Sequence, residues 1–319
     1  MKKEYKTIIN PEYGPMSPKV SLDPDFFSGF HPEHRKEIVG REARFYKSIT
    51  DYFSVDDKLN KYYISISSYD GTEIKVKVYE PLKCQKNGPA FVFMHGGGWM
   101  TCSVETHDFV PSYIAAKAQI VVFSIEYRLA PEHKFPTGLE DCYNAVSYIR
   151  DHANHWSLDP SKISVGGDSS GGNFAAVISQ MTRDRGKFHL DKEVLIYPVT
   201  DLTGMIPKKS AEVYAPVGGD DGPDYMTIYA NPGDDSRNPY LSPLMASDFS
   251  CLPETLLING ECDALLDDGL MYAYELKKAN VPVKFKIFKG MPHAFILRTY
   301  KETFEALDLI CDFLKENHK

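Results

Sequence analysis

The sequence predicts an α/β fold in which a mostly parallel central sheet is flanked by helices. Six short apolar runs recur along the chain, and stretches with apolar residues at helical spacing lie between them. The runs cover residues 90–94, 120–125, 163–165, 194–197, 255–258 and 284–288. Runs that are apolar throughout are typical of strands buried on both faces, as in a parallel sheet covered by helices.

Composition fits this fold class and excludes several functions. With 319 residues, 43% of them hydrophobic and 25% charged, the chain is long enough for one α/β domain with an accessory lid. The net charge of -8 and the lack of Lys/Arg-rich blocks argue against a nucleic-acid or anionic-membrane partner. No apolar run approaches the ~18 residues of a membrane span, and the charged start lacks the apolar stretch of a secretory signal. The six cysteines show no C-x-x-C spacing, so we expect reduced thiols and a cytoplasmic location.

Residues 1–56 are predicted to form an N-terminal cap segment ahead of the sheet. Prolines interrupt this segment, and its aromatic patch and helix-like run comprise Phe26, Phe27, Phe30, Phe45, Ile49 and Phe53. From residue 62 to residue 78 the pattern changes to alternation of apolar and polar residues, and Asp70 and Gly71 lie in the middle of it. Alternation around an Asp-Gly pair predicts an antiparallel hairpin that opens the sheet.

The strand candidates and the helices between them assign residues 57–200 and 249–319 to the α/β core. Helical spacing is clearest over 139–149 and 304–314. One section, 201–248, breaks the alternation and is too long for a simple connection. It carries an aromatic cluster formed by Tyr214, Tyr225, Met226 and Tyr229. We predict a lid that covers a site together with the N-terminal segment, the alternative being a solvated insertion.

The stretch KISVGGDSSGGN at 162–173 contains a G-x-S-x-G motif. A short β-branched run precedes Ser169 and an apolar-periodic run follows it, so this serine is expected where a strand turns sharply into a helix. The flanking glycines allow a strained backbone there, and the N–H of Ser170 then lies at the helix N-terminus. The motif alone is also compatible with an ordinary helix-entry turn.

A serine hydroxyl needs a base to take its proton and an acid to orient that base. Asp263 follows the strand candidate 255–258, and His293 lies in a loop with Gly and Pro after the last strand candidate. We select these two as acid and base, while Asp267 and Asp268 fit helix caps. The remaining loop histidines are expected at the surface: His107, His133, His152 and His155.

The sequence His95-Gly-Gly-Gly-Trp follows the strand candidate 90–94. Bare backbone at Gly96, Gly97 and Gly98 brings N–H groups close to a reacting carbonyl, where they form an oxyanion hole with the Ser170 N–H. A phosphate-binding loop is the alternative, but neither a P-loop ending nor a dinucleotide G-x-G-x-x-G motif is present. No metal-binding motif appears either, so no cofactor is expected.

Taken together, the motifs resemble the hormone-sensitive lipase family of α/β-hydrolases from about residue 89 onward. They are HGGGW, YRLAPE at 127–132, GDSSGGN, NPYLSPL at 238–244, DALLDDG at 263–269 and GMPHAF at 290–295. The resemblance implies a Ser169/Asp263/His293 triad, a cap built from 1–56 and 201–248, and a YRLAPE segment that braces the glycine loop. Arg128 and Glu132 would then be structural. Ser170 departs from the family, which usually has alanine after the nucleophile.

We therefore predict a serine carboxylesterase that acts on small-molecule esters through an acyl-enzyme on Ser169. Short, acetyl-type acyl chains are what the resemblance implies, and activity should rise between about pH 6 and 7 as His293 loses its proton. A non-catalytic ligand-binding receptor on the same scaffold and an amide or lactone hydrolase remain alternatives. The sequence leaves the oligomeric state open, a homodimer included.

Overall fold

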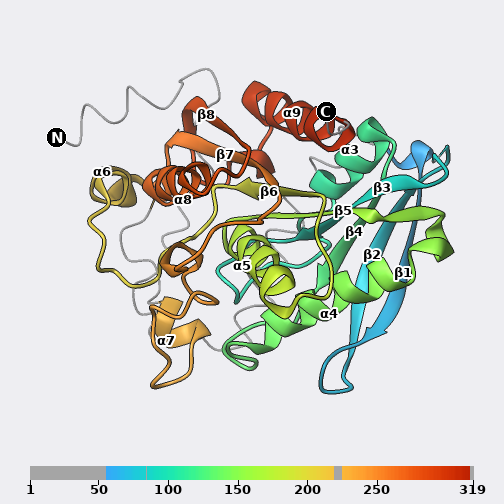
Figure 1. Ribbon diagram of the computed structural model, residues 1–319. Coiled ribbons are helices and arrows are strands. Elements are labelled where there is room, and N and C mark those ends of the chain that lie inside the picture. The colour runs from blue at the N-terminus through green and yellow to red at the C-terminus, as the bar shows by residue number, and fades with distance from the viewer. Residues whose placement is uncertain (1–54, 84, 219–224, 317–319) are drawn as a thin grey trace.

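The computed structural model describes residues 55–83, 85–218 and 225–316. The predicted cap segment therefore lies outside the described residues except for its last two positions, and so do the aromatic patch and the helix-like run within it. The remaining chain forms one eight-stranded sheet with helices on both faces (Figure 1).

The sheet has the strand order β1-β2-β4-β3-β5-β6-β7-β8. β1 (Leu59–Ser67) and β2 (Glu73–Pro81) form the predicted antiparallel hairpin, and β2 is also antiparallel to β4. All other neighbouring strands are parallel. They are β3 (Gly88–Met94), β4 (Val121–Glu126), β5 (Leu158–Asp168), β6 (Lys192–Ile196), β7 (Glu254–Cys262) and β8 (Val283–Pro292). The predicted fold class is confirmed. Four of the six apolar runs lie wholly within strands, and the runs 120–125 and 194–197 each extend one residue beyond β4 and β6.

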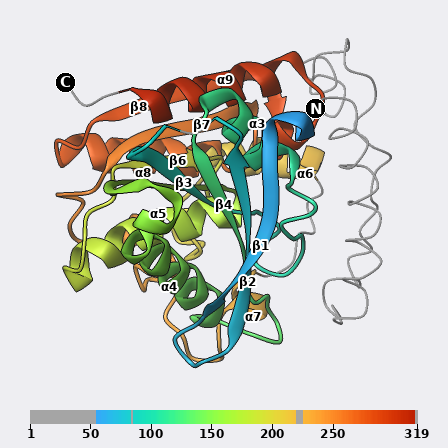
Figure 2. The ribbon, with the colours of Figure 1, turned by 90° about the vertical axis from the view of Figure 1, so that its right-hand side faces the viewer.

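Two layers of helices cover the sheet, each over its own hydrophobic core (Figure 2). One face is covered by α4 (Thr137–Asp151), α5 (Ser170–Arg185) and α8 (Leu266–Lys278), and the other by α3 (Phe109–Ala118) and α9 (Lys301–Lys315). β3, β4, β6 and β7 have buried side chains on both faces, which explains why their sequences are largely apolar, whereas β8 at the edge of the sheet exposes Lys284, Lys286 and Ile287. Between β6 and β7 the chain adds α6 (Lys209–Gly218) and α7 (Tyr225–Tyr229).

The late strands are longer than their apolar cores. β7 continues to Cys262 and β8 to Pro292, where these two residues pair with each other. The segment 289–292, expected as a loop, is therefore strand, and Asp263 and His293 are the first residues beyond two neighbouring strands. Parallel strands present their carboxyl ends at one edge of the sheet, so this extension brings the two side chains together.

Glu193 on β6 is a buried carboxyl group at the centre of the fold. Its side chain is fully buried and accepts a hydrogen bond of 3.0 Å from the Thr255 hydroxyl. Burial raises its pKa from 4.5 to about 7, against the lowering effect of hydrogen bonds from Ser179 and Thr255. The protonated form is therefore favoured in the folded protein.

This shift predicts a pH-dependent stability. The unfolded chain loses the Glu193 proton near pH 4.5 and the folded chain near pH 7, so the stabilisation is complete below pH 4.5 and is lost as pH rises to about 7. The loss amounts to about 3 kcal/mol at 1.36 kcal/mol per pKa unit. Glu193→Gln mimics the protonated form, so in urea unfolding its stability advantage over wild type should be larger at pH 8 than at pH 5. An equal difference at both pH values would contradict this assignment.

Candidate active site

Ser169 lies in the turn between β5 and α5, as the G-x-S-x-G motif predicts. Its backbone has φ 55° and ψ −118°, a region that residues with a side chain rarely adopt. Two hydrogen bonds hold it there: the Ser169 N–H donates to the Ile196 carbonyl (2.9 Å), and the Val199 N–H donates to the Ser169 carbonyl (3.3 Å). A Cβ at Gly171 would lie 2.0 Å from the Met94 carbonyl oxygen, so only glycine permits this tight crossing.

The structure brings Ser169, Asp263 and His293 into one hydrogen-bonded row. His293 Nε2 lies 3.0 Å from Ser169 Oγ, and His293 Nδ1 lies 2.9 Å and 3.1 Å from the two oxygens of the Asp263 carboxylate. Asp263 is fully buried, and its Oδ1 also accepts the Leu265 N–H at 2.8 Å. Because a carboxylate only accepts hydrogen bonds, Nδ1 carries the proton, which leaves Nε2 to accept the proton of the Ser169 hydroxyl.

The electrostatic surroundings favour the protonated form of His293. Removal from solvent lowers the pKa of the imidazole, but the charge and hydrogen bond of Asp263 raise it by more, and Asp168 and Asp268 add to the increase. The resulting pKa is above the ordinary value of 6.5. Since 37% of the side chain is exposed, the imidazole remains in contact with solvent.

The glycine loop approaches the nucleophile from the end of β3. Gly97 has φ +116° and Gly98 has φ +60°, which favour glycine, and a Cβ at Gly97 would lie 2.4 Å from the Thr101 carbonyl oxygen. Neither N–H has a hydrogen-bond acceptor within the described part of the chain. The prediction for Gly96 is corrected, because its N–H donates to Asp168 Oδ1 at 2.8 Å. Gly96 therefore anchors the loop instead of offering a donor.

Asp168 is a buried anchor that the sequence analysis missed. Besides Gly96, its carboxylate accepts the Tyr197 hydroxyl (3.4 Å), and its Oδ1 lies 3.3 Å from His107 Nε2. Burial raises the pKa of Asp168, but His107 and the Gly96 N–H lower it by more, so the net shift is downward. His107 is 1% exposed, so its predicted surface position was wrong, whereas the other three loop histidines are exposed as expected.

The YRLAPE segment braces the glycine loop, as the family resemblance implied. The Tyr127 hydroxyl donates to the His95 carbonyl (2.7 Å), and the Ala130 N–H donates to the Trp99 carbonyl (2.9 Å). Arg128 pairs with the buried Asp141 carboxylate and with Asp70, each at 2.7 Å. These ion pairs agree with the structural role that the resemblance implies.

α7 covers the glycine loop with aromatic side chains. The Trp99 indole stacks on the Tyr229 ring at 4.5 Å, and the Tyr225 ring meets it edge-on at 5.9 Å. A Cβ at Gly98 would lie 2.5 Å from a ring carbon of Tyr225, so this ring rests directly on the loop. The aromatic residues of the 201–248 section thus contact the segment next to the nucleophile.

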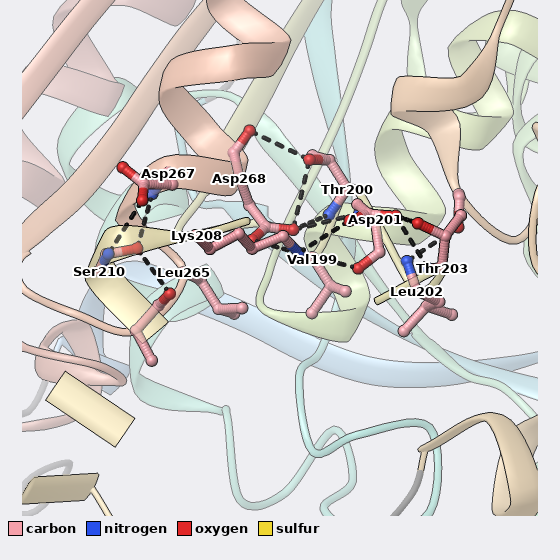
Figure 3. Close-up of polar contacts among 12 residues, drawn as sticks. Val199, Thr200, Asp201, Leu202, Thr203, Lys208, Ser210, Leu265, Asp267 and Asp268 are labelled. Carbon is pink, nitrogen blue, oxygen red and sulfur yellow. Dashed lines mark hydrogen bonds and ion pairs between the residues drawn. The ribbon is translucent and has the colours of Figure 1, made fainter. Parts of the chain in front are cut away.

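Asp268 joins three segments of the chain (Figure 3). Its Oδ1 accepts the N–H groups of Thr200 (2.9 Å) and Asp201 (3.1 Å), and its Oδ2 pairs with the Lys208 ammonium at 2.8 Å. Burial raises the pKa of Asp268, and Lys208 opposes this rise. The predicted role as a cap of its own helix was wrong: Asp268 connects α8 to the loop after β6 and to the segment that leads into α6.

A second connection lies beside it (Figure 3). The Ser210 N–H donates to Asp267 Oδ2 at 2.9 Å, and the Ser210 hydroxyl donates to the Ala264 carbonyl at 2.8 Å. Asp267 also binds a neighbouring segment and does not cap its own helix. The start of α6 is thereby attached to the loop that follows Asp263.

Among the described residues, no three or more His, Cys, Asp or Glu side chains gather in a way that could hold a metal ion. No helix in this part of the chain is long and apolar enough to cross a bilayer.

Comparison with known proteins places the chain in a family. A family model described as the alpha/beta hydrolase fold matches residues 91–297. The carboxylesterase NlhH of Mycobacterium tuberculosis is 37% identical over 233 residues, covering 72% of this chain and 73% of that protein. For the ethyl acetate hydrolase of Pseudomonas putida the identity is 30% over 269 residues, covering 80% and 82%. A solved esterase from Pyrobaculum calidifontis superimposes with a TM-score of 0.80 at 34% identity, covering 94% and 98%. The chain therefore belongs to the α/β-hydrolases and, within them, to the hormone-sensitive lipase family that its motifs indicate.

Proposed function

We propose that this protein hydrolyses carboxylic esters through an acyl-enzyme on Ser169. The observation that carries the proposal is the row of hydrogen bonds from Ser169 Oγ through His293 to Asp263, at 3.0 Å and 2.9 Å. Ser169 attacks the ester carbonyl while His293 takes its proton, and His293 then gives that proton to the leaving alcohol. Water, activated by His293, releases the acid. Asp263 orients the imidazole and stabilises its charged form.

The negative charge that develops on the carbonyl oxygen needs donors aimed at it. We assign this task to the N–H groups of Gly97, Gly98 and Ser170. The first two lie on the glycine loop, and the third opens α5, where the helix dipole also favours negative charge. The anchoring of Gly96 on Asp168 supports this selection, because it fixes the loop at its first glycine.

Short acyl chains are the proposed substrates, with the 201–248 section acting as a lid over the α/β core of 57–200 and 249–319. The Tyr225 ring rests on Gly98, beside the proposed oxyanion hole, and this contact supports a small acyl group there. Attachment of α6 to the loop after Asp263 supports the lid assignment. The name of the Pseudomonas putida relative, an ethyl acetate hydrolase, agrees with a small acyl group.

The pH dependence follows from His293. The base must be neutral to accept the serine proton, so kcat/KM should rise with pH through the pKa of the free enzyme's imidazole. Because Asp263 raises this pKa, the midpoint should lie above 6.5, higher than the sequence alone suggested. The measurement is kcat/KM for p-nitrophenyl acetate, corrected for spontaneous hydrolysis, from pH 5 to 9. A midpoint at or below 6.5 would contradict the assigned electrostatics.

Two measurements test the proposal directly. Hydrolysis of p-nitrophenyl esters from acetate to palmitate should favour the short members and fall with chain length. An alkyl phosphonate with a p-nitrophenyl leaving group should release one equivalent of p-nitrophenol and leave the remaining phosphonyl group on the peptide that carries Ser169, which mass spectrometry detects. Turnover of anilides or lactones in place of esters would identify a hydrolase of another bond. If neither turnover nor labelling is observed, the protein would instead be a ligand-binding scaffold.

A further inference from the structure

The Ser170 side chain takes part in a contact that an alanine at this position would lack. Ser170 is fully buried, and its Oγ accepts the backbone N–H of Trp99 at 3.2 Å. The Ser170 side chain also acts on Tyr127, whose pKa it lowers against the larger raising effect of burial. Trp99 is the last residue of the HGGGW loop, so the residue after the nucleophile also contacts the far end of the glycine loop.

Two hydroxyl groups hold the two ends of the glycine loop. The Tyr127 hydroxyl donates to the His95 carbonyl at 2.7 Å, at the first residue of the loop. The Ser170 hydroxyl accepts the backbone N–H of Trp99, at the last residue. Gly97 and Gly98 lie between these two held ends.

We propose that the Ser170 hydroxyl is a positioning residue that sets the geometry of the oxyanion hole. This inference rests on the proposed ester hydrolysis. The backbone N–H of Ser170 is one donor of the hole, and its side chain holds the loop that supplies the other two. A single residue thus fixes the separation of all three donors, and a displacement well below 1 Å matters for their alignment.

The loop should remain folded when this hydroxyl is removed. The Ala130 N–H still holds the Trp99 carbonyl, Asp168 still holds Gly96, and the Trp99 indole still stacks on Tyr229. The change that remains is local: the buried backbone N–H of Trp99 loses its acceptor, and the loop shifts until this N–H finds another. The expected effect is therefore on rate more than on folding.

The test compares Ser170→Ala with Ser179→Ala. Ser179 is a matched control, because it is a buried serine on the same helix whose contacts lie away from the glycine loop: its hydroxyl donates to the Ala175 carbonyl at 3.1 Å and lies beside Glu193. On p-nitrophenyl butyrate, Ser170→Ala should lower kcat about tenfold with KM within about twofold of wild type, while Ser179→Ala keeps both.

A second readout separates positioning from general damage. A short-chain trifluoromethyl ketone adds to Ser169 Oγ, the serine proton passes to His293, and the former carbonyl oxygen becomes an oxyanion held in the hole. Its inhibition constant should rise by the same factor as kcat falls. The inhibition constant of the corresponding alcohol, which places no oxyanion there, should stay unchanged.

Tyr127→Phe releases the other end of the loop, at His95, and decides the question if Ser170→Ala fails to fold. The double variant should lose less than the product of the two single losses, because both hydroxyls hold the same loop. An unchanged kcat and ketone affinity in folded Ser170→Ala or Tyr127→Phe would overturn the inference while leaving ester hydrolysis intact. A wild type without esterase activity would instead overturn the proposed function.

Discussion

Replacing Ser169 with alanine is expected to lower kcat for short p-nitrophenyl esters by about 10⁵-fold or more. The loss is large because the hydroxyl is the atom that forms the acyl-enzyme, and neither His293 nor the oxyanion donors can replace it. The residual rate would come from water attacking a bound ester near the same donors. Measurement of steady-state hydrolysis, with the wild-type concentration fixed by phosphonate titration, gives the ratio directly.

The backbone at Ser169 supplies a control for this experiment. Its φ of 55° is strained for any residue with a Cβ, and alanine inherits that strain. Ser169→Gly removes the hydroxyl equally and relieves the strain, so it should be as inactive as Ser169→Ala but more stable by about 1 kcal/mol in urea unfolding. A variant that keeps more than about a hundredth of the wild-type rate would contradict the nucleophile assignment.

Much of the fold could be predicted because burial on both faces leaves a direct mark on sequence. The apolar runs of β3 to β7 and the alternation around Asp70 and Gly71 reflect how many faces of each strand are covered. α3 was not identified, because eight of its residues are buried and no polar stripe marks a solvent face. The extensions of β7 and β8 were missed because they contain glycine, proline and charged residues and carry no apolar run.

The triad residues could be selected from the sequence because each follows a recognisable strand, but their supporting contacts could not. Gly96 and Asp168 are 72 positions apart, and no local pattern indicates that one N–H of the glycine loop is already occupied. His107 has the sequence surroundings of a surface residue, yet it is buried against the same carboxylate. Such contacts depend on how loops from different strands meet, so they become visible only in three dimensions.

Asp263→Asn is expected to reduce kcat by about 10⁴-fold without unfolding the protein. The reason lies in the two contacts of this carboxylate. The Leu265 N–H donates to Oδ1, so the carbonyl oxygen of an asparagine must occupy that position and its amide group must face His293. An amide N–H forces Nδ1 to accept, which moves the imidazole proton to Nε2. Nε2 then cannot take the proton of Ser169, although every heavy atom has stayed in place.

The pH profile and a neighbouring carboxylate distinguish this effect from a general loss of charge. Removing the Asp263 carboxylate removes the main interaction that raises the pKa of His293, so the remaining activity should reach half its maximum at lower pH than in wild type. Asp267→Asn removes a nearby carboxylate in the first turn of α8, one that binds Ser210 and not the imidazole, and should keep kcat within about threefold of wild type. Equal losses in the two variants would mean that the site needs the negative charge of this segment as a whole. A large loss of kcat in Asp263→Asn alone, together with the shifted pH profile, follows only if this carboxylate acts by fixing the tautomer of His293.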